Sequence, residues 1–176
     1  MKVSCIIPAY NEEKSIVTTL NTIIPLLNWD LFEIIIINDC SNDQTQDILN
    51  SYPVQKNLHL VHNTNNLGKS ATVSRGIELA KGDYILLLDA DLLHLTKQNI
   101  IDLIAPIKSW KSRSSIAFIK NSRPLPPFKK IDYCNWQRVI PATLLKENIW
   151  KISICISLDW YFLHTLFQMS FFVWQW

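Results

Sequence analysis

Two carboxylates separated by one residue, Asp89 and Asp91, follow an almost wholly apolar run that begins at Tyr84. Such a run is typical of a strand that is buried on both faces of a parallel sheet. The acids then fall at the carboxyl end of the strand, where open α/β sheets bind their ligands. A carboxylate pair suits a hard divalent cation, which can hold a diphosphate. The pattern indicates an enzyme that acts on a nucleotide-diphosphate compound, although two acids at a strand end often only solvate a loop.

A polar turn also follows the first predicted strand, residues 3–7, which Pro8 ends because proline cannot donate to a strand ladder. Asn11 is a favourable N-cap for a helix that the spacing of apolar residues predicts over 12–27. Tyr10 lies in the turn between the strand and the helix. It is therefore either an ordinary surface aromatic or a ring that stacks on a flat base.

A third polar turn follows a predicted strand over 32–38 that contains four consecutive isoleucines. Asp39 stands at the end of this strand, and Ser41 with Gln44 has the spacing of a capping box for the next helix. Asp39 therefore has two interpretations. It either begins the turn, or it accepts a hydrogen bond from a donor on the edge of a nucleobase.

The fourth turn, after a strand over 58–62, carries the tripeptide Gly68-Lys69-Ser70, which resembles the end of a phosphate-binding P-loop. That motif needs a glycine five residues before Gly68, and Asn63 occupies the place, so a nucleoside triphosphatase is excluded. Lys69 at the start of a helix can still meet a phosphate, because helix amino ends attract anions. The helix is predicted to stop near Gly82 as its C-cap.

Four segments in this order resemble the motifs of family 2 glycosyltransferases, and within them the enzymes that make polyprenyl-phosphate sugars. The resemblance covers residues 1 to about 105 and implies a GT-A type fold, a UDP- or GDP-linked sugar donor and inversion at the anomeric carbon. It also implies a divalent metal, Mg²⁺ or Mn²⁺. The segments are Ile7 to Glu12, Ile37 to Asp43, Asn66 to Lys69 with Gly76, and Gly82 to Asp91.

The resemblance also implies roles for single residues. Asp91 matches the second acid of the family's Asp-x-Asp motif, the usual direct metal ligand, and Asp89 matches the first, near the ribose and the metal. Both are therefore candidate catalytic and metal-binding residues. Asp39 matches the acid that reads the base. The other matches lie beside the nucleotide: Pro8, Tyr10 and Glu12 in the first turn, and Lys69.

The alternation of elements predicts an α/β domain with a mostly parallel, Rossmann-like sheet and helices on both faces. Its length of 176 residues suits one domain with a substantial core. We divide it into a nucleotide-sugar-binding core (1–107), a basic acceptor-side segment (108–151) and an apolar, aromatic terminal segment (152–176). Strands are expected near 3–8, 32–38, 58–62, 84–89 and 116–119, and helices near 12–27, 43–51, 69–81 and 96–108, the last capped by Thr96. Residues 137–141 are expected to lead into a short helix that ends near Asn148.

Charge is unevenly distributed: residues 108–151 hold ten Lys and Arg against two Asp and Glu, a balance of +8. This segment is either a solvated basic face or a surface for an anionic membrane or a lipid phosphate, where clustered Lys and Arg contribute about 1 kcal/mol each. A nucleic-acid partner is not expected, because no recognition motif accompanies the charge.

The terminal segment 152–176 has the length of a membrane span. Asp159, His164 and Gln168 argue against one, since a charged residue at mid-span costs about 3 kcal/mol. We therefore expect an interfacial or core-packed segment, with a truncated terminus as the alternative. A predicted strand follows Met1 and Lys2 directly, so we expect no signal peptide, and the four cysteines lack metal-ligand spacing. These features favour free thiols in a reducing cytoplasm, at the cytoplasmic face of a membrane.

Three functions follow from these residues. The first is an inverting transferase that moves a sugar to a polyprenyl phosphate or, alternatively, to a soluble or polysaccharide acceptor. A hydroxyl acceptor needs a general base; the only acids after residue 107 are Asp132, Glu147 and Asp159. The second is a truncated, inactive donor-binding domain. The third, another nucleotide-binding enzyme such as a dehydrogenase, is disfavoured because Pro8 to Asn11 replaces the expected G-x-G-x-x-G.

Overall fold

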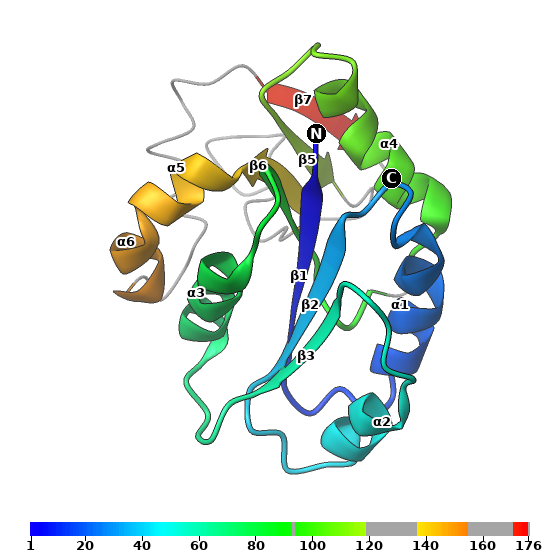
Figure 1. Ribbon diagram of the computed structural model, residues 1–176, viewed down its shortest axis with the longest axis vertical. Helices are drawn as coiled ribbons and strands as arrows, with labels where there is room; N and C mark the ends of the chain where they lie inside the picture. Colours follow the sequence, from blue (N-terminus) through cyan, green and yellow to red (C-terminus); the bar gives the residue numbers. More distant parts are fainter. Residues whose placement is uncertain (93, 119–136, 155–170, 176) are drawn as a thin grey trace, which may run out of the picture.

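A computed structural model describes residues 1–92, 94–118, 137–154 and 171–175 (Figure 1). Seven strands form one sheet in the order β3-β2-β1-β4-β6-β5-β7. Every neighbouring pair is parallel except those made by β6, which runs antiparallel to both β4 and β5. The predicted α/β class with a mostly parallel sheet is confirmed. The strands are β1 Val3–Ala9, β2 Glu33–Asn38, β3 Leu58–His62, β4 Tyr84–Leu87, β5 Ser114–Phe118, β6 Arg138–Pro141 and β7 Phe171–Gln175.

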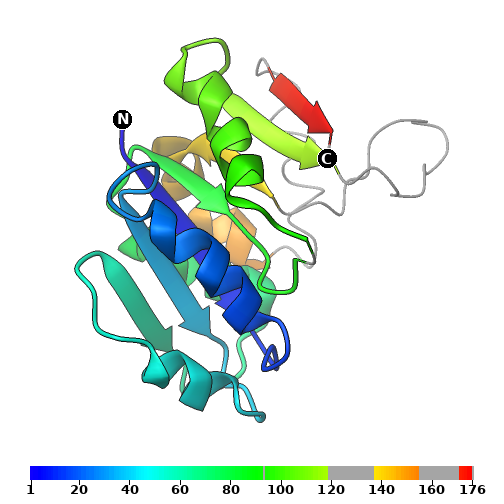
Figure 2. The same cartoon turned by 90° about the vertical axis from the view of Figure 1, so that its right-hand side faces the viewer.

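Helices cover both faces of this sheet, as Figures 1 and 2 show. The described helices are α1 Ile16–Ile23, the 3₁₀ turn η1 Ile24–Leu26, α2 Thr45–Ser51, α3 Lys69–Leu79, α4 Lys97–Lys108, α5 Ala142–Glu147 and α6 Ile149–Ile154. One hydrophobic core contains residues of α1, α2 and α4, and a second contains residues of α3, α5 and α6. The isoleucines of β2 explain how both cores form. Ile34 and Ile36 enter the first, and Ile35 and Ile37 enter the second, because successive side chains of a strand point to opposite faces.

Gly76 lets α3 lie directly on the sheet. A Cβ atom at this position would stand 2.5 Å from Cγ2 of Ile6 and 2.8 Å from Cδ1 of Ile37. Both neighbours are fully buried in the second core, so they have little room to move. The glycine is thus explained by the close packing of α3 against the sheet.

Three predicted helix ends are wrong. The helix expected from residue 12 begins at Ile16, and Asn11 does not cap it but adopts a left-handed backbone with φ 55°. The capping box of Ser41 does not form, because α2 begins at Thr45 and the Ser41 hydroxyl donates to Oδ1 of Asn38. The helix expected to stop near Gly82 ends at Leu79. At Asn11 and after α3, hydrogen bonds to distant segments replace the local ones that the sequence suggests, whereas Ser41 exchanges its predicted cap for another local partner. The Thr96 cap of α4 is confirmed, with a reciprocal capping box to Asn99.

The segment that follows residue 136 adds a strand that the sequence analysis missed. Residues 138–141 form β6, between β4 and β5, before the predicted short helix α5. Of the terminal segment, residues 152–154 belong to α6 and 171–175 form β7 against β5, whereas 155–170 lie outside the described residues. Within the described ranges, no helix has the length and apolar character to cross a membrane.

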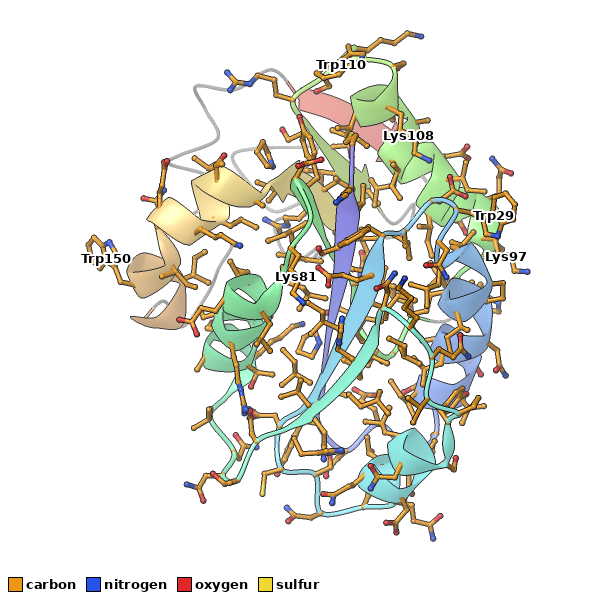
Figure 3. All side chains as sticks on the ribbon, viewed as in Figure 1. Trp29, Lys81, Lys97, Lys108, Trp110 and Trp150 are labelled. Carbon is orange, nitrogen blue, oxygen red and sulfur yellow. The ribbon has the colours of Figure 1, made fainter. Side chains whose placement is uncertain are left out.

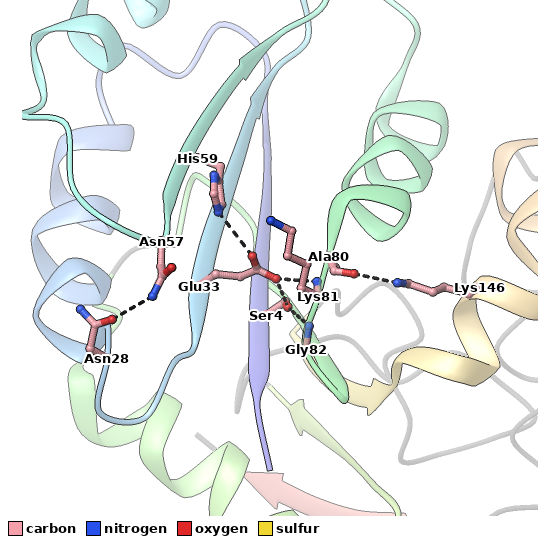
Figure 4. Close-up of polar contacts among 9 residues, drawn as sticks. All are labelled: Ser4, Asn28, Glu33, Asn57, His59, Ala80, Lys81, Gly82 and Lys146. Atoms are coloured by element: carbon pink, nitrogen blue, oxygen red, sulfur yellow. Dashed lines mark hydrogen bonds and ion pairs between the residues drawn. The ribbon is translucent and has the colours of Figure 1, made fainter.

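A buried carboxylate ties together the amino ends of the strands, at the edge of the sheet where β2 begins (Figure 4). Oε1 of Glu33 accepts hydrogen bonds from the hydroxyl of Ser4 and the backbone N–H of Lys81, both at 2.6 Å. Oε2 lies 3.4 Å from Nε2 of His59 on β3. The Ser4 hydroxyl also accepts from the N–H of Gly82 at 2.8 Å, in a space that a larger side chain would fill. Glu33 therefore joins β1, β2, β3 and the turn before β4.

Candidate functional site

A pocket of about 400 Å³ lies at the carboxyl ends of β1, β2 and β4. The parallel register explains its position, because β1 pairs with both β2 and β4 and all three strands end at the same edge. All seven residues that the sequence analysis selected line this pocket. The complete lining is Pro8, Ala9, Tyr10, Glu12, Asp39, Asn66, Gly68, Lys69, Thr72, Asp89, Ala90 and Asp91.

The turn after β1 is fastened to the turn after β2 by reciprocal hydrogen bonds. The N–H of Asn11 donates to the Ser41 hydroxyl at 3.0 Å, and the N–H of Asn42 donates to Oδ1 of Asn11 at 2.8 Å. The N–H of Glu12 donates to the hydroxyl of Thr45 at 2.8 Å. These contacts hold the chain in a turn, with a left-handed backbone at Asn11, and α1 begins only after this turn. They also hold the turn that presents Tyr10, an exposed ring at the pocket.

Asp89 is held between two protein donors. Lys69 places Nζ 2.6 Å from Oδ1, and Gln137 donates from Nε2 to Oδ2 at 3.0 Å. Burial raises the pKa of the Asp89 carboxyl, and the nearby Asp91 adds to this, whereas the Lys69 and Arg138 cations act in the opposite direction. Gln137 was not selected from the sequence, because nothing in its neighbourhood predicted that β6 would lie beside β4.

Glu12 is a third acid at the same place. Burial raises the pKa of its carboxyl, a hydrogen bond from Ser15 opposes this, and the charges of Asp91 and Asp89 raise the pKa further. Glu12 therefore lies close enough to Asp89 and Asp91 to feel their charges, and all three residues line the pocket. Such a concentration of negative charge is relieved by binding a cation.

The carboxylates suit Mg²⁺ or Mn²⁺ only with help from other oxygens. Over the described ranges, no group of three or more His, Cys, Asp or Glu side chains is arranged to hold an ion by itself. Mg²⁺ usually keeps several waters and is bound by one or two carboxylates together with substrate phosphates. Asp91 and Asp89 fit that pattern, since they lie side by side on the wall of a pocket large enough for further oxygen ligands.

We predict that cation-dependent ligand binding weakens on mild acidification. A hard cation needs ionised carboxylates, and the pKa values of Asp89 and Glu12 are raised above their ordinary values of 3.8 and 4.5. Both groups therefore take up protons at a higher pH than exposed carboxyls do, and the cation is released there. Titration calorimetry of Mn²⁺ with a nucleoside diphosphate across pH 4–8 measures this.

Without a cation, the same carboxyls make the folded protein more stable at low pH than at high pH. A raised carboxyl pKa gives stability that is present below the pKa of the unfolded chain and is lost as the pH rises through the folded pKa. Because the ion binds the ionised carboxylates, we expect Mn²⁺ to raise the melting temperature more at pH 7 than at pH 5. An equal shift at both values would show that Asp89 and Glu12 are not linked to the ion.

Asp39 is more deeply engaged than the sequence suggested. Its carboxylate is 3% exposed and accepts three hydrogen bonds. Oδ1 accepts from Nδ2 of Asn63 at 2.6 Å and from the N–H of Leu67 at 2.9 Å, and Oδ2 accepts from the N–H of Gly68 at 2.9 Å. Asp39 therefore organises the loop that leads into α3 and also lines the pocket. Asn63 was considered only as a missing P-loop glycine.

The described Lys and Arg side chains of the basic segment 108–151 have different partners and different burial. Lys108 pairs with Asp30 at 2.5 Å, Lys146 donates to the carbonyl of Ala80 at 2.7 Å, and Arg138 is buried. Figure 3 shows Lys108 and Trp110 beside α4, far from α5 and α6, where Trp150 lies. Lys120, Arg123, Lys129 and Lys130 lie outside the described residues.

Of the three acids considered as a general base, one lies among the described residues. Glu147 is exposed at the end of α5 and does not line the pocket. Asp132 and Asp159 lie outside the described residues.

Comparison with known proteins gives matches over most of the chain. Residues 4–168 match the family described as Glycosyl transferase family 2. The chain is 32% identical over 166 residues to a poly(ribitol-phosphate) beta-glucosyltransferase of Bacillus spizizenii, which covers 84% of this chain and 26% of the relative. It is 36% identical over 113 residues to a dolichol-phosphate mannosyltransferase of Pyrococcus furiosus, covering 62% and 31%.

A crystal structure of Staphylococcus aureus TarS in complex with UDP-GlcNAc superposes with a TM-score of 0.65 at 27% identity. The superposition covers 84% of this chain and 47% of that one. The chain spans about a quarter to a third of the length of the two relatives above.

Proposed function

We propose, from the premise that this chain belongs to glycosyl transferase family 2, that it binds a nucleotide-diphosphate sugar and transfers the sugar with inversion. Its fold is the GT-A type that the sequence motifs predicted. The single observation that carries the proposal is the convergence of Pro8, Tyr10, Asp39, Lys69 and the Asp-x-Asp acids on one pocket. The similar TarS structure, which holds UDP-GlcNAc, supports a UDP-linked donor.

Each residue then has a chemical task. Asp91 and Asp89 hold a divalent cation, which when bound neutralises the diphosphate and favours its departure. Lys69, at the amino end of α3, meets a phosphate oxygen with its ammonium group. Asp39 accepts from the base, while Tyr10 lies against the same part of the donor. The acceptor oxygen attacks the anomeric carbon as the bond to the diphosphate breaks, so one displacement inverts the configuration.

For the acceptor we propose a polyprenyl phosphate. The support is the name of the Pyrococcus furiosus relative, together with the resemblance of the sequence motifs to enzymes that make polyprenyl-phosphate sugars. A phosphate monoester is already ionised near neutral pH and attacks without a general base, so this acceptor does not require one of the acids after residue 107. A glycan or phosphate-polymer acceptor is the second candidate, because the Bacillus spizizenii relative is named for poly(ribitol-phosphate).

Donor binding is tested by thermal shift with UDP-glucose, UDP-GlcNAc, GDP-mannose and NADH, each with and without Mn²⁺. We expect stabilisation by at least one nucleotide sugar, stronger with the ion, and none by NADH. A donor that is bound but neither transferred nor hydrolysed would favour the alternative of an inactive donor-binding domain. No stabilisation by any nucleotide sugar would contradict the proposal.

A lipid-phosphate acceptor implies presentation at a membrane, which we place at the cytoplasmic face. We predict that the protein floats with liposomes containing anionic lipid at low salt, and that high salt weakens this, because surface charges are screened. Neutral liposomes of the same size serve as the control. Failure of a folded, monodisperse protein to bind anionic liposomes at low salt would leave the glycan acceptor as the better candidate.

A further inference from the structure

The loop before α3 is connected to the pocket through one buried amide. Asn63 follows β3 and is 6% exposed. Its Nδ2 donates to Oδ1 of Asp39 at 2.6 Å and to the hydroxyl of Thr72 at 3.1 Å. Its Oδ1 accepts from Nη1 of Arg75. Because the amide meets acceptors on one side and a cation on the other, its orientation is determined by its partners.

Arg75 begins this chain of contacts from the middle of α3. Besides Asn63, its Nη1 approaches the backbone carbonyl of His62 at 3.4 Å. The guanidinium thus contacts the side chain of Asn63 and the carbonyl of the residue before it. Arg75 itself does not line the pocket, and neither does Asn63, so both act through the lining residues that Asn63 contacts, Asp39 and Thr72.

The hydrogen bonds to Asp39 determine what it can offer to a ligand. An ionised carboxylate has about four acceptor positions. Among the described residues, Oδ1 has two donors and Oδ2 has one. The Asp39 carboxylate is therefore fixed in one orientation, with Oδ2 as the oxygen that retains more capacity.

We infer that Asn63 and Arg75 are positioning residues that aim the Asp39 carboxylate at an imino N–H on the base of the donor. Uracil and guanine carry such a donor, at N3 and N1. Cytosine and adenine present an unprotonated ring nitrogen at the corresponding edge, which faces the carboxylate with a like partial charge. This inference deepens the proposed function and rests on it.

The first test measures the affinity of the wild-type protein for UDP, GDP, CDP and pyrophosphate by calorimetry with Mn²⁺. We expect UDP or GDP to bind at least about tenfold more tightly than CDP, since a hydrogen bond to a charged group is at stake. Equal binding of CDP would overturn the inferred selectivity. Binding of none of the three nucleotides would instead contradict the proposed function.

The second test is a double-mutant cycle with Asn63→Ala and Asp39→Ala, using whichever of UDP and GDP binds more tightly. Asn63→Ala is expected to weaken nucleotide binding about tenfold and to leave pyrophosphate binding unchanged. In the Asp39→Ala background the same change is expected to have less than about a twofold effect, because the residue that it positions is gone. An equal effect in both backgrounds would overturn the positioning role.

Arg75 gives an independent test that does not depend on a buried position. Arg75→Gln is expected to weaken nucleotide binding, and Arg75→Lys to restore part of it, because lysine keeps a cation that can donate to Asn63. Exposed Lys97→Gln is the control for loss of a surface charge. If Arg75→Gln folds with wild-type affinity for the nucleotide, Arg75 does not take part.

Discussion

Replacing Asp91 by asparagine is expected to remove the metal-dependent part of donor binding, with a loss of more than about 100-fold in affinity in the presence of Mn²⁺. Changes to groups that only orient metal ligands cost 10–100-fold, so the loss of a direct carboxylate ligand costs more. Asp91 lines the pocket and, within the described part of the chain, no hydrogen bond or ion pair to it is found. Asp89, by contrast, is already held by Lys69 and Gln137.

The measurement is calorimetry of the nucleoside diphosphate with Mn²⁺ and with EDTA, for the wild type and Asp91→Asn. The substitution keeps the size of the side chain, so a change in fold is not the cause of a loss. Asp47→Asn, at an exposed position on α2, is the matched control. Should Asp91→Asn show the same difference between Mn²⁺ and EDTA as the wild type, Asp91 is not the metal ligand.

The pocket was predictable from the sequence because it depends on where buried strands end. The runs before Asp39 and Asp89 are apolar enough to be recognised as strands, and parallel strands end at one edge of a sheet. Every residue selected on that basis lines the pocket. The same reasoning gave the positions of the first five strands and the cap at Thr96.

What the sequence did not reveal depends on contacts between distant segments. Gln137 meets Asp89 only because β6 inserts between β4 and β5, and a four-residue strand has too short a pattern to be recognised. Asn11 resembles a helix cap but bonds to the next turn instead, since that turn offers reciprocal partners 30 residues away. Local propensity therefore failed at the turns that build the site.

Replacing Glu33 by leucine is expected to lower the free energy of unfolding by about 3–5 kcal/mol. The change removes the acceptor of two hydrogen bonds, from the hydroxyl of Ser4 and from the N–H of Lys81. Glu33 is 1% exposed, so water cannot replace the lost acceptor. Each buried polar group left without a partner costs about 1–3 kcal/mol. Because small proteins are stable by only about 5–15 kcal/mol in total, this is a large fraction.

Urea unfolding followed by circular dichroism measures the effect as a shift of the midpoint at constant slope. Glu33→Gln, which keeps one oxygen for Ser4 and Lys81, is expected to lose clearly less stability than Glu33→Leu. Glu78→Leu, at an exposed position on α3, is the control and is expected to change stability by less than about 0.5 kcal/mol. Equal midpoints for Glu33→Leu and the wild type would show that the buried contacts contribute nothing net.

The position of Glu33 separates this effect from binding. It is the first residue of β2, whereas the pocket lies beyond the last residue of the same strand. A strand of six residues places about 17 Å between them. The fraction of Glu33→Leu that is folded is therefore expected to bind the nucleotide with wild-type affinity, whereas the folded fraction of Asp39→Ala is expected to bind it weakly. Unfolding and binding measurements on these two variants would then distinguish a stabilising residue at the start of β2 from a ligand-binding residue just after its end.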